Sequence, residues 1–184
     1  MILTELQIDT LLEQKSISNE WPWSTNNEQV IDGHIADIVA DVCREVRLKD
    51  KSEYNHYGSG YSSFVDCWLY REDDDFRFAT GDCYWGLVVL ISRLSRYYVV
   101  GEGQKTWHSQ GGSSYLPCFE FVDQIEHRAT TNLVEAVCNV LDSHGLVRLT
   151  QKQLSGVLSR DLKIPTILTD PPWHHFDAIF YWED

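Results

Sequence analysis

YSSFVDCWLYR, residues 61–71, sets the expected fold class of this chain. In an extended segment successive side chains point to opposite faces. Phe64, Trp68 and Tyr70 therefore share one face, while Val65, Cys67 and Leu69 share the other. Aromatic and β-branched residues favour strands. This stretch predicts a β-strand with large side chains on both faces.

The residues that follow extend the β pattern. The acidic turn 72–75 leads into Phe76–Phe78, which is typical of the return of a hairpin, and CYWGLVVLI at 83–91 is a long apolar run. Residues 84–98 also fit a helical period, but Gly86 and the Tyr, Trp and Val content favour a strand. A further strand is expected at 115–122, at a sheet edge because of Pro117. The C-terminal segment 176–182, with alternating large apolar side chains, is predicted as a strand that returns to the sheet.

Helices are expected on both sides of this β region. Thr4 with Gln7 and Thr25 with Glu28 are capping-box signatures at the starts of helices over 4–15 and 25–47. Helical spacing recurs at 133–144, and Thr150 with Gln153 begins another helix. The order of elements predicts an α+β fold, a mainly antiparallel sheet of about four to six strands (residues 61–121 plus 176–182) flanked by N-terminal helices and two C-terminal helices. We expect one domain over 1–184, in which an N-terminal helical segment, 1–50, packs on an α+β body, 51–184.

Charge and composition narrow the function classes. The 184 residues include 28 acidic and 15 basic ones, a net charge of −13, and residues 1–92 alone carry −10. Coating of nucleic acid needs Lys and Arg, so a nucleic-acid partner is not expected. No apolar run is long enough for a membrane span, and the N-terminus has no basic region before its apolar residues, as a signal peptide would. With five cysteines and no C-x-x-C spacing, a cytoplasmic protein with free thiols is expected.

Motifs of catalysis or cofactor binding are missing from the sequence. It contains no Gly-x-Ser-x-Gly, no phosphate-binding loop, no His-Glu-x-x-His and no dinucleotide-binding glycine motif. His174 and His175 are adjacent, a spacing that on an extended segment rarely lets one metal take both. We therefore assign no catalytic residue, no metal ligand and no cofactor.

The leading hypothesis is a non-enzymatic acidic interaction protein, either monomeric or a homodimer, whose partner is a protein with a basic surface. Small acidic proteins that neutralise a basic toxin share this composition, and no family motif accompanies the likeness. Large aromatic side chains give contact area, and charge complementarity speeds encounter. The predicted partner-binding residues are acidic ones spaced four apart on the second helix, those of the turn, and two tryptophans: Asp37, Asp41, Glu45, Asp73, Asp74, Asp75, Trp21 and Trp23.

The alternative is a small hydrolase or ligand-binding protein with its site on the concave face of the sheet. Asp66 stands in an otherwise apolar strand, where burial would raise its pKa. The predicted lining of such a pocket is Asp66, Trp68, Tyr70, Trp85 and Arg93.

Overall fold

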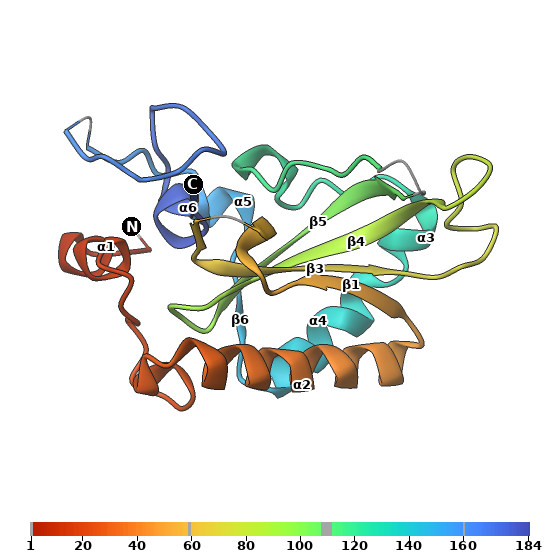
Figure 1. Cartoon of the computed structure of the whole chain (residues 1–184), viewed down its shortest axis with the longest axis horizontal. Helices are drawn as coiled ribbons and strands as arrows, with labels where there is room; N and C mark the ends of the chain where they lie inside the picture. Colours follow the sequence, from red (N-terminus) through yellow and green to blue (C-terminus); the bar gives the residue numbers. More distant parts are fainter. Residues whose placement is uncertain (1, 59, 108–111, 160) are drawn as a thin grey trace.

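The computed structural model describes residues 2–58, 60–107, 112–159 and 161–184. Figure 1 shows a β-sheet across the middle of the molecule, with helices below it and a long segment and shorter helices above it. The five-stranded sheet has the order β1-β3-β4-β5-β6, and a separate two-stranded sheet pairs β2 with β7. The strands are β1 (Lys49–Glu53), β2 (Tyr61–Ser62), β3 (Phe64–Tyr70), β4 (Cys83–Ser92), β5 (Tyr97–Thr106), β6 (Val147–Arg148) and β7 (Trp182–Glu183).

The helices are mostly short, and α2 is the longest of them. The α-helices are α1 (Glu5–Leu12), α2 (Glu28–Val46), α3 (Arg128–Thr131), α4 (Val134–Ser143), α5 (Gln151–Leu154) and α6 (His175–Ile179). Three 3-10 turns complete the described structure, η1 (Trp23–Thr25), η2 (His56–Gly58) and η3 (Phe119–Phe121). The predicted α+β class, with a mainly antiparallel sheet between N-terminal and C-terminal helices, is confirmed.

Antiparallel pairing of β1, β3, β4 and β5 fixes which residues share a face. Cys67, Val89 and Val100 lie in register on the face covered by α2 and α4, which Figure 1 places below the sheet. Trp68, Val88 and Gly101 lie in register on the opposite face. The short strand β6 adds to β5 in parallel and is the exception to the antiparallel pattern.

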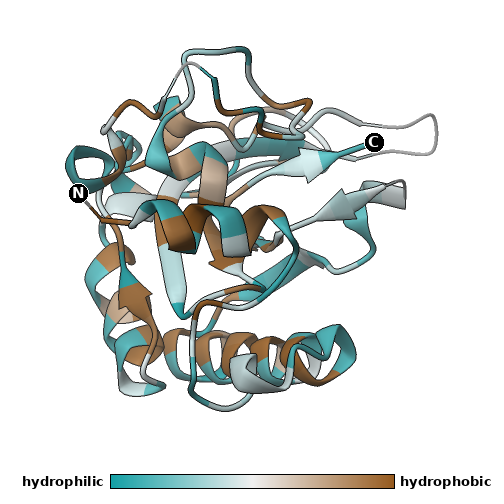
Figure 2. Cartoon of the chain, turned by 90° about the vertical axis from the view of Figure 1, so that its left-hand side faces the viewer, coloured by the Kyte–Doolittle hydropathy of each residue, from teal (hydrophilic) through white to brown (hydrophobic). Residues whose placement is uncertain are grey.

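Helix α2 shows why the helical layer forms. Its buried residues, Ile31, Ile35, Ile38, Val39 and Val42, recur at helical spacing and join the main hydrophobic core. Figure 2, coloured by hydropathy, shows hydrophobic and hydrophilic residues alternating along the helices, as expected where one side of a helix meets a core. The helix begins at a cap provided by Asn27, whose Oδ1 accepts from the backbone N of Val30 at 3.3 Å. Thr25, the expected cap, instead donates its hydroxyl to Pro22 O and ends η1.

The ambiguous segment 84–98 is extended, as β4 and the start of β5, so the strand interpretation is confirmed. The strand predicted at 115–122 is wrong, because the only regular element in this part of the chain is the turn η3. Pro117 has no backbone N–H and so cannot donate a hydrogen bond to a neighbouring strand. The return at 76–78 makes one bridge, Arg77 with Tyr84, and does not become a strand. Strand β1 has no counterpart among the predicted strands, because its sequence, KDKSE, is that of a polar, largely exposed edge.

The predicted C-terminal strand over 176–182 is also wrong. Residues 175–179 form α6, and extended structure is limited to β7, which pairs with β2. Phe176 and Phe180 are four residues apart, a spacing that suits a helix as well as one side of a strand. The backbone N of His174 donates to Asp177 Oδ2 at 2.7 Å, a cap that favours the helix.

No helix among the described residues is both long enough and apolar enough to cross a membrane.

Candidate functional site

The acidic face of α2 consists of Asp37, Asp41 and Glu45, which lie on one side of the helix because they are spaced four apart. Asp37 and Glu45 are exposed. Asp41 is partly covered and contacts two basic groups, Arg44 Nη2 at 2.6 Å and His144 Nε2 at 3.2 Å. The described residues provide no ion pair to Asp37 or Glu45, so these two carboxylates face solvent.

Trp21 continues this face at the N-terminal end of α2. Its side chain is 64% exposed and its ring meets the ring of His34 edge-on, with centroids 4.9 Å apart. His34 precedes Asp37 by three residues and so lies on the same side of the helix. Burial, with a smaller effect of His144, lowers the pKa of His34, so its ring is neutral at pH 7. An exposed indole therefore stands beside the acidic face.

Trp23 has a different position from Trp21. Its side chain is 1% exposed, and its indole N–H donates to Ser92 O at 3.1 Å, at the end of β4. Trp23 fixes the entry to α2 onto the sheet and is not accessible to a partner in this structure.

The acidic turn 73–75 begins two residues after Arg71, whose Nη2 donates to Val46 O at 2.8 Å at the C-terminal end of α2. Asp73 Oδ1 accepts from the backbone N–H groups of Asp75 and Phe76, at 3.1 and 3.3 Å, and so holds the turn together. Asp74 and Asp75 are exposed. Figure 1 shows the loop that contains them at the right-hand end of the sheet, on the side of the molecule where α2 also ends.

Asp66, at the centre of the alternative site, is buried with its carboxyl held by two phenols. Tyr57 donates to Oδ2 at 2.8 Å and Tyr115 donates to Oδ1 at 2.6 Å. Burial raises the pKa of Asp66 above its usual value, although both hydrogen bonds and Lys105 act in the opposite direction. Both oxygens thus have partners within the protein.

The same face of the sheet is filled by aromatic rings. Trp68 and Tyr70 are 0% and 4% exposed and stack with centroids 4.3 Å apart, and the ring of Trp107 meets both of them. A Cβ at Gly86 would collide with the Trp68 ring, so the indole can pack here only because residue 86 is glycine. This face is packed rather than hollow at the predicted residues.

The other two residues of the predicted lining lie elsewhere. Trp85 is on the helix-covered face of β4, where its ring stacks on His127 with centroids 5.2 Å apart. Arg93 is 1% exposed and pairs with Asp32 of α2 through Nε and Nη2, at 2.8 and 3.0 Å. It also donates to the carbonyls of Tyr54, Ser62 and Phe64. The structure brings Asp66, Trp68 and Tyr70 to one face, but not Trp85 or Arg93.

Within the described residues no three His, Cys, Asp or Glu are gathered closely enough to hold a metal ion. All five cysteines are free. Burial and Asp50 raise the pKa of Cys43 to about 12, which makes this thiol a poor nucleophile at neutral pH.

Two features of the structure have no clear signal in the sequence: the partners of Asp66 and the surroundings of His175. An aspartate in an apolar strand signals a need for hydrogen bonds. Tyr57 and Tyr115 come from segments far apart in sequence, and no spacing rule selects them from the nine tyrosines. The sequence shows His174 and His175 as an adjacent pair, but only the structure shows that His175 is buried.

The comparisons with protein-family models, curated proteins and solved structures found no match to this chain.

Proposed function

We propose that this chain is a non-enzymatic binding protein that holds a basic protein on the acidic face of α2, in the manner of an inhibitor or immunity protein. The observation that carries the proposal is the row of His34, Asp37, Asp41 and Glu45 along one side of α2, with the exposed ring of Trp21 edge-on against His34. From His34 to Glu45 the row spans about 16 Å of helix, at 1.5 Å per residue.

The charges of this row suit a basic partner. Asp37 and Glu45 are exposed and form no ion pair within the described part of the chain. Uncompensated carboxylates on one surface attract a partner of opposite charge and speed encounter, an effect that salt weakens. Lys or Arg side chains that meet this face would replace solvent around both carboxylates.

Trp21 provides the apolar contact that charge alone lacks. Tryptophan is enriched among the residues that dominate binding energy at interfaces. The indole is 64% exposed, and its edge contact with His34 limits its freedom before any partner arrives. A ring that is already positioned loses less entropy on binding.

The test is affinity capture with the wild-type chain, followed by titration of the captured basic protein at low and high salt. Three variants are compared: Asp37→Lys with Glu45→Lys, Trp21→Ala, and a matched control, Glu126→Lys with Glu135→Lys. The control pair makes the same change of net charge at two other exposed positions. We expect the first two variants to weaken binding at least about tenfold and the control to weaken it by no more than about threefold.

Two results would contradict the proposal. One is equal loss of binding in the two charge-reversed pairs, which would mean that only net charge matters. The other is a captured partner whose affinity is unaffected by the α2 pair and by Trp21→Ala.

A further inference from the structure

Two histidines lie at the acidic face of α2. His34 is on α2 itself, three residues before Asp37, and its side chain is partly exposed. His144 follows the last residue of α4, and its Nε2 lies 3.2 Å from Asp41 Oδ2. Histidine is the side chain whose charge ordinarily changes between pH 5 and 8. The charge of this face therefore depends on pH near neutrality.

The ring of His34 is held by two indoles. Trp21 and Trp23 meet it edge-on, with centroids 4.9 and 5.8 Å from its own. Burial lowers the pKa of His34, the charge of His144 lowers it further, and Asp37 acts in the opposite direction. His34 is thus neutral at pH 7 and becomes charged only in acid. The effect of His144 means that the two rings repel each other when both are protonated.

Arg96 ties the two parts of the chain that carry these groups. Its Nη1 donates to Glu20 Oε2 at 2.7 Å, next to Trp21, and to Gly145 O at 3.2 Å, next to His144. Other charged groups on α2 and on the elements packed against it have partners of their own: Asp142 with Tyr98, Glu28 with His56, Asp32 with Arg93, Lys49 with Glu72, and Asp50 with Cys43. Glu135 is in the first turn of α4, at the opposite end of that helix from His144.

Protonation of the two histidines cancels the charge of the face. With both rings neutral, the three carboxylates of Asp37, Asp41 and Glu45 against the guanidinium of Arg44 give a net charge of −2. Two added protons bring this charge to zero. We infer that the acidic face of α2 is a pH-dependent docking site, which holds its basic partner at pH 7.5 and releases it as the pH falls toward 5.5. This inference rests on the proposed function and adds its regulation.

Octalysine is the probe, because its charges are all lysine and stay protonated at both pH values. The full chain is titrated with it at pH 7.5 and at pH 5.5, at one fixed ionic strength, while NMR follows the amides of residues 34–45. Asp and Glu side chains ordinarily remain ionised at pH 5.5. An exposed charge changes affinity about threefold, so the wild type should bind octalysine about tenfold more weakly at pH 5.5.

The double variant His34→Gln with His144→Gln removes both titrating groups and keeps the other five of the seven histidines. Its affinity for octalysine should change by no more than about twofold between the two pH values. Glutamine at position 34 also alters the contact with Trp21, but it does so at both pH values. The ratio of the two affinities is therefore the readout.

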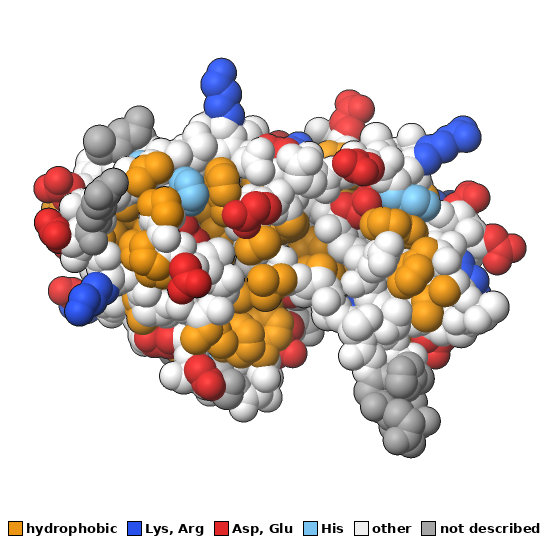
Figure 3. Space-filling model, turned by 90° about the horizontal axis from the view of Figure 1, so that it is seen from above, with side chains coloured by type: hydrophobic (Ala, Val, Ile, Leu, Met, Phe, Trp, Pro, Cys, Tyr) orange, Lys and Arg blue, Asp and Glu red, His pale blue; other side chains and the backbone are white. Residues whose placement is uncertain are grey.

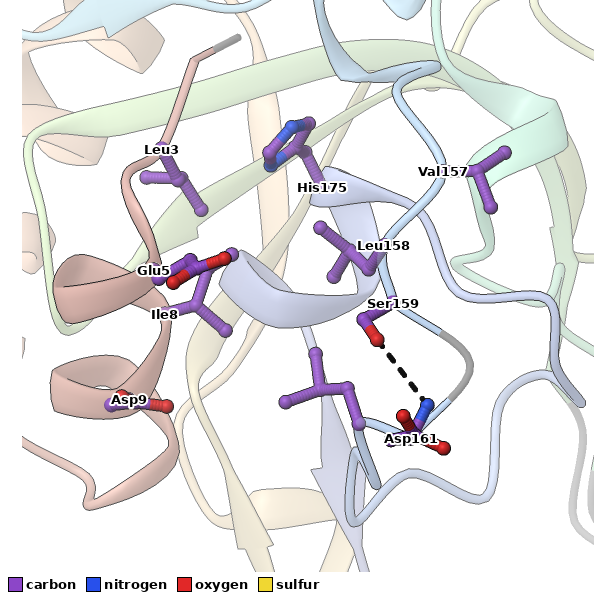
Figure 4. A pocket seen from close by; sticks show the side chains of 10 residues that line it. Leu3, Glu5, Ile8, Asp9, Val157, Leu158, Ser159, Asp161 and His175 are labelled. Atoms are coloured by element: carbon purple, nitrogen blue, oxygen red, sulfur yellow. Dashed lines mark hydrogen bonds between the residues drawn. The ribbon is translucent and has the colours of Figure 1, made fainter.

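His174→Gln is the matched control, because it removes a histidine on the other side of the sheet. Figure 1 shows α2 below the sheet and α6, which begins after His174, above it. Seen from above, that side carries exposed hydrophobic side chains with acidic ones among them (Figure 3). There His175 lines a pocket of about 400 Å³ together with Ile8 and Asp9 of α1 (Figure 4). His174→Gln should keep the about tenfold pH effect of the wild type.

A pH titration of the free chain tests the histidine pair without any probe. The pKa of His34, followed through its side-chain NMR signals, should rise in His144→Gln, because the variant removes the neighbouring positive charge. An unchanged pKa of His34 would show that the two rings do not act on one face, and would overturn the inference.

Two results with octalysine would also overturn it. One is a double variant that loses as much affinity between pH 7.5 and pH 5.5 as the wild type, which would assign the effect to net charge alone. The other is a wild-type affinity that changes by less than about threefold.

Asp37→Lys with Glu45→Lys separates these results from failure of the proposed function. If this variant binds octalysine more weakly than the wild type at pH 7.5, the docking face stands even where the pH effect is absent. If it binds octalysine as tightly as the wild type does, the proposed function and its pH dependence fail together.

Discussion

Replacement of Asp66 by Asn tests whether burial of the Asp66 carboxyl lowers the stability of the fold at neutral pH. The carboxyl is buried between Tyr57 and Tyr115, and burial raises its pKa. The folded protein therefore keeps the Asp66 proton at pH values where the unfolded chain has released it. The contribution of Asp66 to the free energy of unfolding is fully present below the unfolded pKa of about 3.8. It is lost as the pH rises through the raised pKa of Asp66 in the folded protein.

The size of the effect follows from proton linkage. One proton bound in the folded state and absent from the unfolded state changes the free energy of unfolding by at most about 1.4 kcal/mol per pH unit. Asparagine has the shape of aspartate, and its amide can donate to one phenol while its carbonyl accepts from the other. Asp66→Asn should thus match the wild type near pH 4 and become the more stable of the two as the pH rises toward 7.

The assay is urea denaturation of both proteins at intervals from pH 4 to pH 8. The control is Asp74→Asn, which removes an exposed carboxylate and should differ from the wild type by no more than about 0.5 kcal/mol at every pH. A free-energy difference between Asp66→Asn and the wild type that stays constant over this range would refute the reasoning. So would a difference of opposite sign, in which the wild type gains stability as the pH rises.

Five further substitutions probe the packing. Trp23→Ala should destabilise the fold by about 3–5 kcal/mol, because the side chain of Trp23 is 1% exposed. Trp21→Ala should change the free energy of unfolding by less than about 0.5 kcal/mol, because Trp21 is 64% exposed. Urea denaturation measures both values. Gly33→Ala should stabilise α2 by about 0.5–1 kcal/mol, since an added Cβ meets no atom within 4 Å. Gly86→Ala should destabilise the fold by about 1–3 kcal/mol, because its Cβ would collide with the buried Trp68 indole. The two variants should shift the melting temperature in opposite directions. Asp32→Asn should cost about 3 kcal/mol, because it leaves a buried guanidinium without its counter-charge; an unchanged midpoint in denaturant would contradict this role.

The sequence predicts those parts of the fold in which local residue preferences favour one conformation. Helix α2 could be predicted because its apolar residues occupy one side only. Residues 64–70 are buried on both faces, and their aromatic content correctly favours a strand. The segment 175–181 is equally buried and aromatic, so it gives the same signal, and no amphipathic period marks it as a helix. What decides its conformation is the cap at Asp177, which composition does not reveal.

The candidate sites show a sharper limit. The spacing of Asp37, Asp41 and Glu45 is enough to place them on one face, because a helix depends only on neighbours in the chain. Trp21 and Trp23 have the same neighbours in sequence, yet one is exposed and the other buried, a distinction set by the distant Ser92 carbonyl. His144 reaches Asp41 from the other half of the chain, and such a contact follows only from the complete fold.

The contacts of Arg93 couple α2 to the sheet during unfolding. One guanidinium joins the first turns of α2, the segment before β2 and the start of β3. Detaching α2 would leave the Arg93 charge in a nearly dry interior, so partial opening there costs almost as much as general unfolding. In hydrogen exchange, amides of α2 and of β3 are therefore expected to be released together, as one cooperative unit rather than as a helix that frays from a persisting sheet.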